Sequence, residues 1–504
     1  MLTRTPSVPV HHTRDGVGRE GTLSPRVGTI LAERLKIATD GPSLWTMAKN
    51  ILGLLVGGLL VCTALGTVGC RKAKARHTET AAEEGNTDTA TSPGVYPDKI
   101  VLSSTAVFTG PNAGWGADTW RGSEAYFAEV NARGGVNGRK IEVRAVDDGY
   151  ETPRAMTNLK SMIEKNDFFA LWNFVGSNIM VETVAELDKH RDKNLFQFAS
   201  IASTSAFRKG PTADRAFAVR APISLEMKQA VDAFLAAGMK KIAVFHQDDG
   251  YGKSGYDGVV AALEGHGLKV VAQTKHGVFQ KFDESVKPQV DQMKAAGADV
   301  VFDIGNYQAA AALVRDTHGA GWNVPIVSNA SLNDAYIRTV LAEEKKTGKH
   351  LATNLVGVKV VPSADETELP LIREYRELVE KRNPMPPSEL TDPNFRFNKF
   401  GFQSVEGFIN AKIMVEILNR CGATPVRAKL KEAAESIHDW DIGLGTPVTF
   451  GPEDHTALDK VWLYYIKDGE WTKLQDVKAA LGASAVATTP AAPAGKPATA
   501  TAKK

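Results

Sequence analysis

Cysteine is scarce in this chain, with three residues among 504. So few cysteines exclude a disulfide-stabilised scaffold and a cysteine-rich zinc domain. An excess of positive charge is also lacking, because 60 lysine and arginine residues stand against 58 aspartate and glutamate residues. A dedicated nucleic-acid surface needs a basic patch, so we expect no nucleic-acid partner. The hydrophobic share of 43% is ordinary, which excludes wholesale disorder, and the length predicts two or three domains.

Catalytic signatures are also missing. The sequence contains no GxxxxGK[ST], HExxH, CxxC or GxSxG motif, so phosphate-loop, zinc-protease, thiol-redox and serine-hydrolase chemistry lose their usual support. We expect no dinucleotide site either. Asp147 and Asp148 are adjacent acids, for which loop capping, ligand contact and acid–base chemistry are the alternatives. Because no nucleophile and base come together, we expect a binding protein with no catalytic residues, cofactor or metal.

One long apolar run is present, at residues 51–69, with no charge over 19 positions. This length suits the core of a secretion signal or a marginal membrane span. The run ends in Thr67-Val68-Gly69-Cys70, which resembles a bacterial lipoprotein cleavage box, with Thr67 at the place where leucine is usual. Cys70 would then be the lipidated first residue of the mature chain. An uncleaved membrane anchor is the alternative.

The ends of the chain carry no pattern of a folded domain. We expect translation to begin at Met47, which makes residues 1–46 a doubtful leader and residues 47–69 a signal peptide. Residues 70–97 are rich in alanine, threonine, glutamate and lysine without an apolar period, and this predicts a flexible tether. Residues 481–504 are a low-complexity stretch of alanine, proline and threonine, which predicts disorder.

Between these ends, apolar runs of strand length alternate with amphipathic stretches. The run KIVLSSTAVF is typical of a strand, and ADTWRGSEAYFAEVNA is typical of a helix that stops at Gly134-Gly135. The alternation restarts after about residue 222. It predicts an α/β fold of two Rossmann-like lobes with parallel-rich sheets. In such sheets ligands bind at the carboxyl ends of the strands.

Several side chains at these strand ends suit ligand binding. Ser177 opens a predicted helix, where a hydroxyl and free N–H groups can hold an anion. Trp115 lies in a glycine-rich loop, where it can form an aromatic wall or pack over a helix end. Tyr251 and Tyr307 occupy comparable loops of the second array, and Ser200 and Ser203 offer hydroxyl groups. For each residue a purely structural role is the alternative.

At these residues the chain resembles the bacterial leucine/isoleucine/valine-binding proteins, the solute receptors of ABC transporters with the type I periplasmic-binding fold. Four segments carry the resemblance: TGPNAGWGADTWRGSEAYFAEVNARGGVNGRKIEVRAVDDGYETPRA, FAVRAPISLE, KIAVFHQDDGYGKSGYDGV and FQSVEGFINAKIMVEIL. The resemblance covers about residues 99–474. It implies a hinged receptor with a first lobe of residues 98–220 and 358–446 and a second lobe of residues 221–357 and 447–480.

The resemblance also implies a ligand site. The residues that the resemblance places in this site are Trp115, Ser177, Ser200, Ala202, Ser203, Tyr251, Tyr307 and Asn329. Amino-acid receptors of this family place a glutamate against the ligand ammonium, after the strand that corresponds to VPIVSNA. Here that stretch is Ser328-Asn329-Ala330, without an acid. Asp303 or another residue would have to replace it, and an amide, a carboxylate, urea or an aromatic acid fits as well as an amino acid.

The resulting hypothesis is an extracytoplasmic or periplasmic, lipid-anchored and monomeric receptor. It closes on a small ligand and delivers it to an ABC permease with its ATPase subunits. A tethered sensor of the same fold, reporting to a signalling partner, is the alternative from another class. An enzyme of Rossmann-like architecture is a third hypothesis, and it would need the catalytic set that the sequence lacks.

Overall fold

The structure, a computed structural model, describes residues 92–332, 334–392 and 395–486. None of the helices in these ranges is both long enough and apolar enough to cross a membrane. The apolar run 51–69, the start at Met47 and the lipidation residue Cys70 lie outside the described residues.

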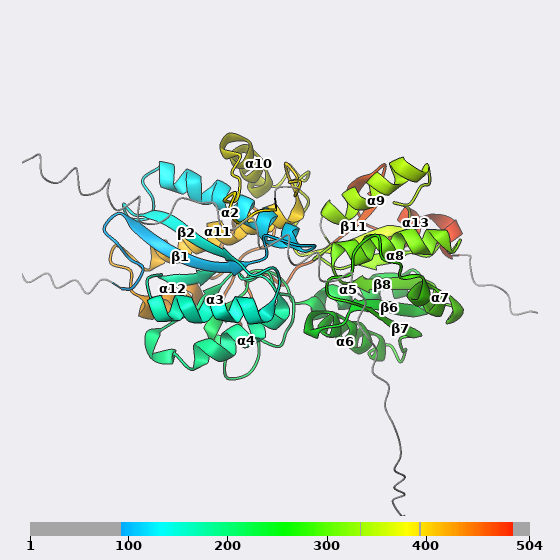
Figure 1. Ribbon diagram of the computed structural model, residues 1–504, viewed down its shortest axis with the longest axis horizontal. Helices are drawn as coiled ribbons and strands as arrows, with labels where there is room; N and C mark the ends of the chain where they lie inside the picture. Colours follow the sequence, from blue (N-terminus) through cyan, green and yellow to red (C-terminus); the bar gives the residue numbers. More distant parts are fainter. Residues whose placement is uncertain (1–91, 333, 393–394, 487–504) are drawn as a thin grey trace, which may run out of the picture. The chain divides into compact units, whose positions relative to one another are not determined.

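The first sheet has five parallel strands in the order β2-β1-β3-β4-β5. Its strands are β1 (Lys99–Ala106), β2 (Lys140–Asp147), β3 (Ala170–Trp172), β4 (Gln197–Phe198) and β5 (Ala216–Phe217). The helices packed with it are α2 (Ala113–Ala132), α3 (Thr152–Lys165), α4 (Ser177–Asp188), α10 (Pro370–Arg382), α11 (Phe402–Arg420) and α12 (Leu430–Glu435). We call this sheet and its helices the first lobe (Figure 1).

Strand β1 shows why this sheet is covered on both faces. Successive side chains of a strand point to opposite faces. Ile100 and Leu102 pack in the cluster that contains residues of α2 and α11, whereas Val101 packs in the cluster built on α3 and α4. Helices therefore lie on both faces of this parallel sheet, as the alternation of strands and helices along the chain predicted.

The second sheet has seven strands in the order β12-β11-β10-β9-β8-β6-β7. Its strands are β6 (Ile242–Gln247), β7 (Ala272–His276), β8 (Val300–Ile304), β9 (Ile326–Ser328), β10 (Leu355–Lys359), β11 (Trp462–Lys467) and β12 (Glu470–Lys473). Strands β6 to β10 are parallel, and β11 and β12 form an antiparallel hairpin at the edge beside β10. The fold class predicted from the sequence, two parallel-rich α/β lobes, is confirmed.

Helices cover both faces of the second sheet as well. They are α5 (Ile223–Ala236), α6 (Gly250–Glu264), α7 (Lys287–Ala295), α8 (Tyr307–Gly319) and α9 (Asp334–Thr347). Val300 and Phe302 of β8 share a cluster with α5 and α6, and Val301 shares one with α7, α8 and α9. We call this sheet and its helices the second lobe.

The chain passes between the lobes through a shared apolar region. The apolar cluster that contains Ile100 and Leu102 of β1 continues through Val219, Ala221 and Val360 into the second lobe. The first connection is hydrogen-bonded to the segment before β11, where the Ala218 N–H donates to the His455 carbonyl oxygen at 2.8 Å and the Ala457 N–H donates to that of Ala218 at 2.8 Å. The lobe boundaries given by the sequence stay predictions. The hydrogen bonds between neighbouring strands show to which of the two sheets each strand belongs.

Two segments assigned to flexible ends are folded in part, and there the sequence prediction is wrong. Val95, placed in the tether, is buried and forms an antiparallel bridge with Ile100. Gly94 precedes it with φ +77°, and a Cβ there would lie 2.0 Å from the Phe168 carbonyl carbon. At the other end, α13 (Val477–Val486) runs into the predicted disordered tail, because Val477 and Leu481 are buried in the core.

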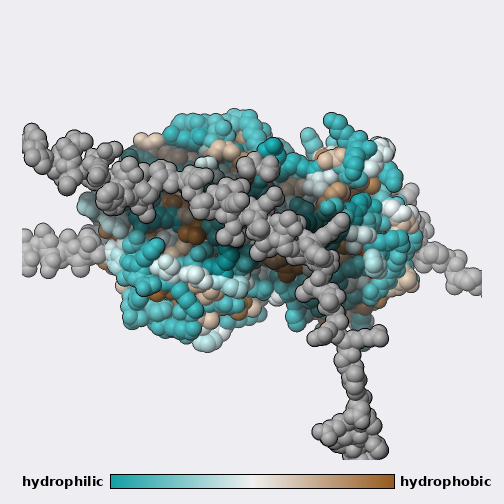
Figure 2. Space-filling model, in the orientation of Figure 1, coloured by the Kyte–Doolittle hydropathy of each residue, from teal (hydrophilic) through white to brown (hydrophobic). Residues whose placement is uncertain are grey.

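The described surface is mostly hydrophilic in the view of Figure 2. Few large apolar side chains are exposed on it: Val146, Val181, Val271, Phe279 and Met385. Most of the apolar residues that the structure describes therefore serve the cores.

Candidate functional site

Trp115 joins the two lobes. It lies in the first turn of α2 and not, as the sequence predicted, in a loop, and it is only 3% exposed. Its indole Nε1 donates to the carbonyl oxygen of Ser331 at 2.7 Å, across to the loop that follows β9. Its ring also meets two tyrosines edge-on, Tyr150 at 5.1 Å and Tyr251 at 6.4 Å between centroids. The loops at the strand ends of the two lobes are therefore in direct contact around an aromatic centre.

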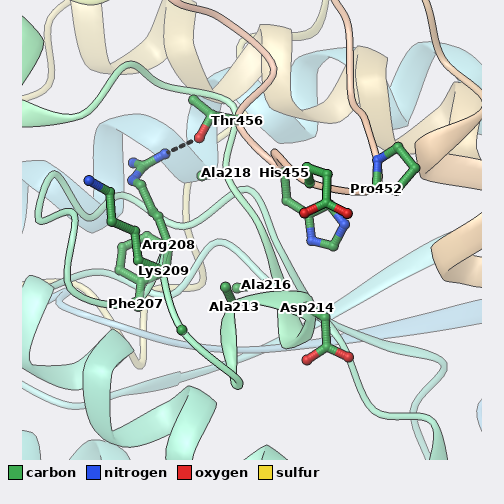
Figure 3. A pocket seen from close by; sticks show the side chains of 12 residues that line it. Phe207, Arg208, Lys209, Ala213, Asp214, Ala216, Ala218, Pro452, His455 and Thr456 are labelled. Atoms are coloured by element: carbon green, nitrogen blue, oxygen red, sulfur yellow. Dashed lines mark hydrogen bonds between the residues drawn. The ribbon is translucent and has the colours of Figure 1, made fainter.

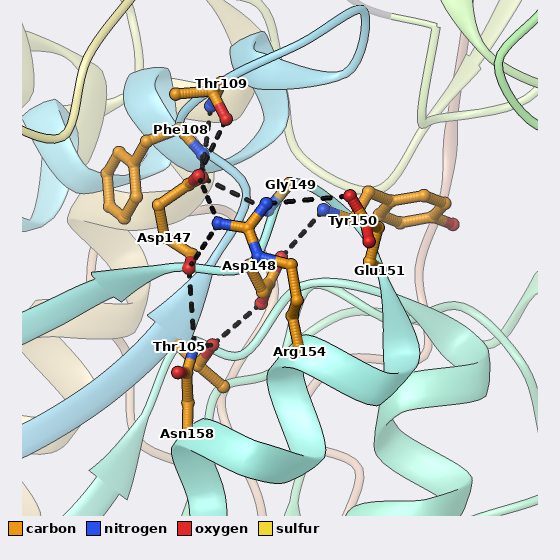
Figure 4. A network of polar contacts seen from close by, with 10 residues as sticks. All are labelled: Thr105, Phe108, Thr109, Asp147, Asp148, Gly149, Tyr150, Glu151, Arg154 and Asn158. Carbon is orange, nitrogen blue, oxygen red and sulfur yellow. Dashed lines mark hydrogen bonds and ion pairs between the residues drawn. The ribbon is translucent and has the colours of Figure 1, made fainter.

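The loop that presents Trp115 is fixed by Asp147, at the end of β2 (Figure 4). The Asp147 carboxylate accepts from the backbone N–H of Phe108 at 2.8 Å and of Thr109 at 3.2 Å, and from the Thr109 hydroxyl at 2.7 Å. The guanidinium group of Arg154 forms an ion pair with the Asp147 carboxylate, with 3.0 Å between Nη2 and Oδ2. These hydrogen bonds keep the pKa of Asp147 below its ordinary value despite burial. Asp147 is thus a loop-capping residue, one of the alternatives drawn from the sequence.

Asp148 fixes the neighbouring Tyr150 in the same network. Its carboxyl group accepts from the Thr105 hydroxyl at 2.9 Å and from the Tyr150 N–H at 2.9 Å. Tyr150 has φ +67°, the left-handed region that non-glycine residues rarely enter. Burial raises the pKa of Asp148 to about 7. The hydrogen bonds of Asp147 and Asp148 therefore hold the loops that place the Tyr150 ring against Trp115.

Ser177 is the first helical residue of α4, and it does not cap the helix. The N-cap is Gly176, with φ +122° and no side-chain hydrogen bond. Buried Ser177 instead accepts from the Thr204 N–H at 3.3 Å through its Oγ. Thr204 in turn shares a 2.7 Å hydrogen bond with Ser254 of α6, in the second lobe. Ser177 therefore lies beside a polar bridge between the lobes.

The Ser200–Ser203 segment supplies buried hydroxyl groups at a neighbouring strand end. The Oγ atoms of Ser200 and Ser203 are buried and have no hydrogen-bond partner. Ala202 packs in the core between the first sheet and helices α3 and α4. An unpaired buried hydroxyl costs free energy unless something binds it. The two serines thus keep the capacity to bind a ligand, while Ala202 contributes packing.

Tyr251 and Asn329 form the second lobe's side of the aromatic centre. The Tyr251 hydroxyl donates to Asn329 Oδ1 at 2.9 Å, and both side chains are buried. Asn329 Nδ2 has no partner. Tyr307 opens α8 and is 6% exposed. Burial raises its pKa to about 12, against the effect of a hydrogen bond from the backbone of Gly114, next to Trp115. Tyr251, Asn329 and Tyr307 therefore all approach the Trp115 loop.

Glu226 is a buried acid that the sequence reasoning did not assign to the site. It belongs to α5, and its Oε2 accepts from the Ala330 N–H at 2.8 Å, in the stretch that has no acid of its own. Its Oε1 is unpaired, and burial raises its pKa. Glu226 ends the segment FAVRAPISLE, which carries part of the family resemblance but gave no reason to place this residue in the site. Tyr150 and Ser331 were missed as well, although Tyr150 lies in the noted DDGYETP segment.

Buried charges gather where the chain crosses between the lobes. Arg220 lies beside Glu406 of α11, with 3.1 Å between Nε and Oε1, and the two side chains are 1% and 2% exposed. Lys359, at the end of β10, is fully buried with its ammonium over the rings of Phe402 and Trp471. Burial lowers the pKa of Lys359 to about 8. A buried charge is costly to leave alone, so Arg220 and Glu406 depend on each other as an ion pair.

A glycine pattern at the start of α6 was overlooked in expecting no dinucleotide site. Residues 250–255, GYGKSG, follow β6 with the GxGxxG spacing. Here the glycines serve packing, since a Cβ at Gly252 would lie 2.0 Å from the Gln247 carbonyl oxygen. The Asp249 carboxylate caps the helix by accepting from the Gly252 N–H at 2.9 Å. A negative charge therefore occupies the place where a pyrophosphate would bind.

A pocket of about 360 Å³ lies apart from these residues, between segments 207–218 and 452–456 (Figure 3). Two of its polar side chains have partners: Arg208 donates to Thr456 at 3.2 Å, and His455 contacts Glu435 at 2.8 Å. No residue predicted from the sequence lines it. Within the described residues there is also no cluster of potential metal ligands. Cys421 is buried and unpaired, as expected of a small core residue.

Comparisons with known proteins agree with this geometry. The family model described as periplasmic binding protein matches residues 105–470. A Pseudomonas aeruginosa protein named "Amino acid binding protein" is 24% identical over 239 residues, which are 46% of this chain and 60% of that protein. The chain thus matches less than two thirds of the length of that relative.

Solved structures share the fold. A structure described as a possible leucine/isoleucine/valine-binding protein from Rhodopirellula baltica has a TM-score of 0.65 and 25% identity, covering 76% of this chain and 98% of that one. A fatty acid ABC transporter substrate-binding protein from Thermomonospora curvata has a TM-score of 0.65 and 23% identity, covering 77% and 94%. The arrangement of lobes described above is that of these binding proteins.

Proposed function

From the premise that the chain belongs to the periplasmic binding protein family, with the type I fold of the leucine/isoleucine/valine-binding proteins, we propose that it is a lipid-anchored solute receptor outside the cytoplasm. It binds a small amino-acid-like, amide or carboxylate ligand between its lobes and delivers it to an ABC permease with its ATPases. It is not an enzyme, and it acts as a monomer held to the membrane through Cys70.

The observation that carries this proposal is the contact of the two lobes through side chains at their strand ends. Trp115 of the first lobe reaches Ser331 and Tyr251 of the second. A ligand that touches both sets of loops binds fully only when they are together, so its binding free energy favours the closed state. A permease that distinguishes closed from open receptors would then receive only loaded ones.

The polar groups left unpaired around this contact indicate the class of ligand. Ser200 Oγ, Ser203 Oγ and Asn329 Nδ2 can each donate a hydrogen bond. Together with the start of α4 at Ser177, they suit a carboxylate or an amide oxygen. Two buried acids border the stretch 328–330: Glu226, which accepts from the Ala330 N–H, and Asp303, which pairs with Ser328 in the β8–β9 ladder and has both carboxyl oxygens unpaired. Burial raises the pKa of both acids, which favours their neutral forms, so amides and carboxylates stand beside amino acids as candidates.

A test uses the purified chain in a thermal-shift screen against amino acids, amides, urea, aliphatic acids and aromatic acids. We expect stabilisation that rises with the ratio of free ligand to Kd. Trp115→Ala should weaken binding at least tenfold, because large buried aromatics dominate such contacts. Trp115→Phe keeps a smaller aromatic ring and loses the hydrogen bond to Ser331, so a smaller loss of about threefold to tenfold is expected.

Controls separate loss of the site from loss of the fold. Ser177→Ala should weaken binding, whereas Ser388→Ala, at an exposed position of the first lobe, should leave it unchanged. Each variant must unfold cooperatively near the temperature of the natural chain. If no solute stabilises the chain, the receptor proposal is wrong. If affinity survives both Trp115→Ala and Ser177→Ala, the receptor binds elsewhere.

A further inference from the structure

The loop of residues 329–332, between β9 and α9, carries contacts from the second lobe to the aromatic centre. Asn329 accepts from the Tyr251 hydroxyl at 2.9 Å, and the carbonyl oxygen of Ser331 accepts from Trp115 Nε1 at 2.7 Å. The second acceptor is a backbone atom, so its position depends on what holds the loop backbone and not on the side chain at position 331.

Glu226 holds the first part of this loop. Its Oε2 accepts from the Ala330 N–H at 2.8 Å, and the side chain is fully buried. Inside the loop, the Leu332 N–H donates to the Asn329 carbonyl oxygen at 3.0 Å. Glu226 lies in the first turn of α5, directly after the first connection between the lobes. The Ala330 amide is therefore tied to that connection.

Lys359 holds the end of the same loop. Its ammonium donates to the Leu332 carbonyl oxygen and lies 4.9 Å from the ring centroid of Phe402 and 4.6 Å from that of Trp471. Among the residues that the structure describes, no carboxylate is within ion-pair distance of this ammonium. Burial lowers the pKa of Lys359 to about 8, so the site disfavours the charged form. An apolar side chain of similar length would avoid this cost, so packing alone does not explain the lysine.

The surroundings of these two side chains reach into the first lobe. Arg220, on the first connection, lies 3.1 Å from Glu406 of α11. Asp334 begins α9 just after the loop and accepts from the N–H of Phe402, the first residue of α11, at 3.2 Å. Helix α11 of the first lobe is therefore in contact with the groups that hold the loop, and a change at the connections would reach the loop backbone.

We propose that Glu226 and Lys359 are positioning residues for ligand capture, which hold the backbone of residues 330–332 so that the Ser331 carbonyl oxygen meets Trp115 when the lobes come together. Neither side chain has to touch the solute. This inference rests on the proposed function, in which the loop forms part of the second lobe's side of the site. It adds the residues that tie this part of the site to the connections between the lobes.

The first test follows the indole N–H resonance of Trp115 by NMR in the ¹⁵N-labelled full chain without solute. Its resonance is assigned by its loss in Trp115→Phe. Lys359→Met keeps the length of the side chain but cannot donate to the Leu332 carbonyl oxygen, so the resonance should shift toward that of an indole without a hydrogen bond. Lys345→Met, at an exposed position of α9, is the matched control and should leave the resonance in place.

The second test measures amide hydrogen exchange of Ala330 in two variants of Glu226. Glu226→Ala removes the acceptor, and the Ala330 amide should exchange about tenfold faster or more. Glu226→Gln keeps an oxygen acceptor of the same shape and imitates the neutral acid that burial favours, so exchange should stay within about twofold of the natural chain. Protection of β6 in the same samples shows that the second lobe remains folded.

The outcomes decide the inference without any solute. An unchanged Trp115 resonance in Lys359→Met, or unchanged Ala330 exchange in Glu226→Ala, would overturn it. Equal exchange in Glu226→Ala and Glu226→Gln would overturn it too, because the oxygen acceptor would then not hold the loop. If Lys359→Met unfolds, β6 loses its protection and the Glu226 pair decides. A failed solute screen would remove the proposed function and leave these measurements unchanged, so the two failures are distinguishable.

Discussion

At the scale of single residues, Asp148 shows how burial changes the chemistry of a side chain. The carboxyl group is fully buried with two hydrogen-bond donors and no cation within ion-pair distance among the described residues. Its pKa is raised to about 7, so at a pH of about 5 the carboxyl group is protonated in the folded chain and ionised in the unfolded chain. The folded state therefore binds more protons than the unfolded state between about pH 4 and pH 7, and stability falls as the pH rises through this range.

Asp148→Asn removes this titration and keeps a side chain of the same shape. From pH 5 to pH 8 this titration should lower the free energy of unfolding of the natural chain by about 2–3 kcal/mol, and the variant should not show this loss. Guanidinium unfolding at the two pH values measures the difference. Asp257→Asn, at an exposed position of α6, controls for the loss of one charge. A stability difference that is the same at both pH values would contradict the buried proton.

At the scale of elements, helices α2 and α11 cross at glycine residues, and this contact shapes the first lobe. A Cβ at Gly407 would lie 2.0 Å from the Thr119 carbonyl oxygen, and one at Gly122 would lie 1.8 Å from that of Ser404. Ser123 then bridges the helices by donating to the Gly407 carbonyl oxygen at 3.0 Å. Since α2 carries Trp115 in its first turn, this crossing also positions the aromatic centre.

Gly407→Ala should destabilise the chain by about 3 kcal/mol or more, because backbone of α2 stands where the new methyl group would lie. Gly319→Ala is the matched control, as an exposed helical glycine with nothing within 4 Å of a Cβ. It should be neutral or stabilise by up to about 1 kcal/mol. Thermal unfolding of the two variants compares them. Equal stability would mean that the helices are not in close contact.

The elements also show what the sequence could and could not predict. Runs such as KIVLSSTAVF predicted strands, and their alternation with amphipathic stretches predicted that the strands are parallel. The buried anchor Val95 was missed because one valine in a polar stretch has no period. The GYGKSG segment shows the limit of such motifs, since glycine spacing alone does not show whether a helix start is free or capped by its own aspartate.

At the scale of the whole molecule, the family could be identified from sequence, but the partners of individual site residues could not. Trp115 was placed by its glycine-rich loop, whereas its hydrogen bond to Ser331 joins residues 216 positions apart. Such contacts depend on how two lobes meet, and no local pattern encodes them. Glu226 was missed for the same reason, because its helix begins far along the chain from the Ala330 amide that it binds.

If the chain is a receptor, both lobes hold one small solute at once. Amide hydrogen exchange of the full chain, read by mass spectrometry with and without the solute that gives the largest thermal shift, tests this directly. We expect added protection in two separate segments, around residues 107–116 of the first lobe and 329–332 of the second, and its loss in Trp115→Ala. Protection confined to one lobe, or no protection in either segment, would contradict it.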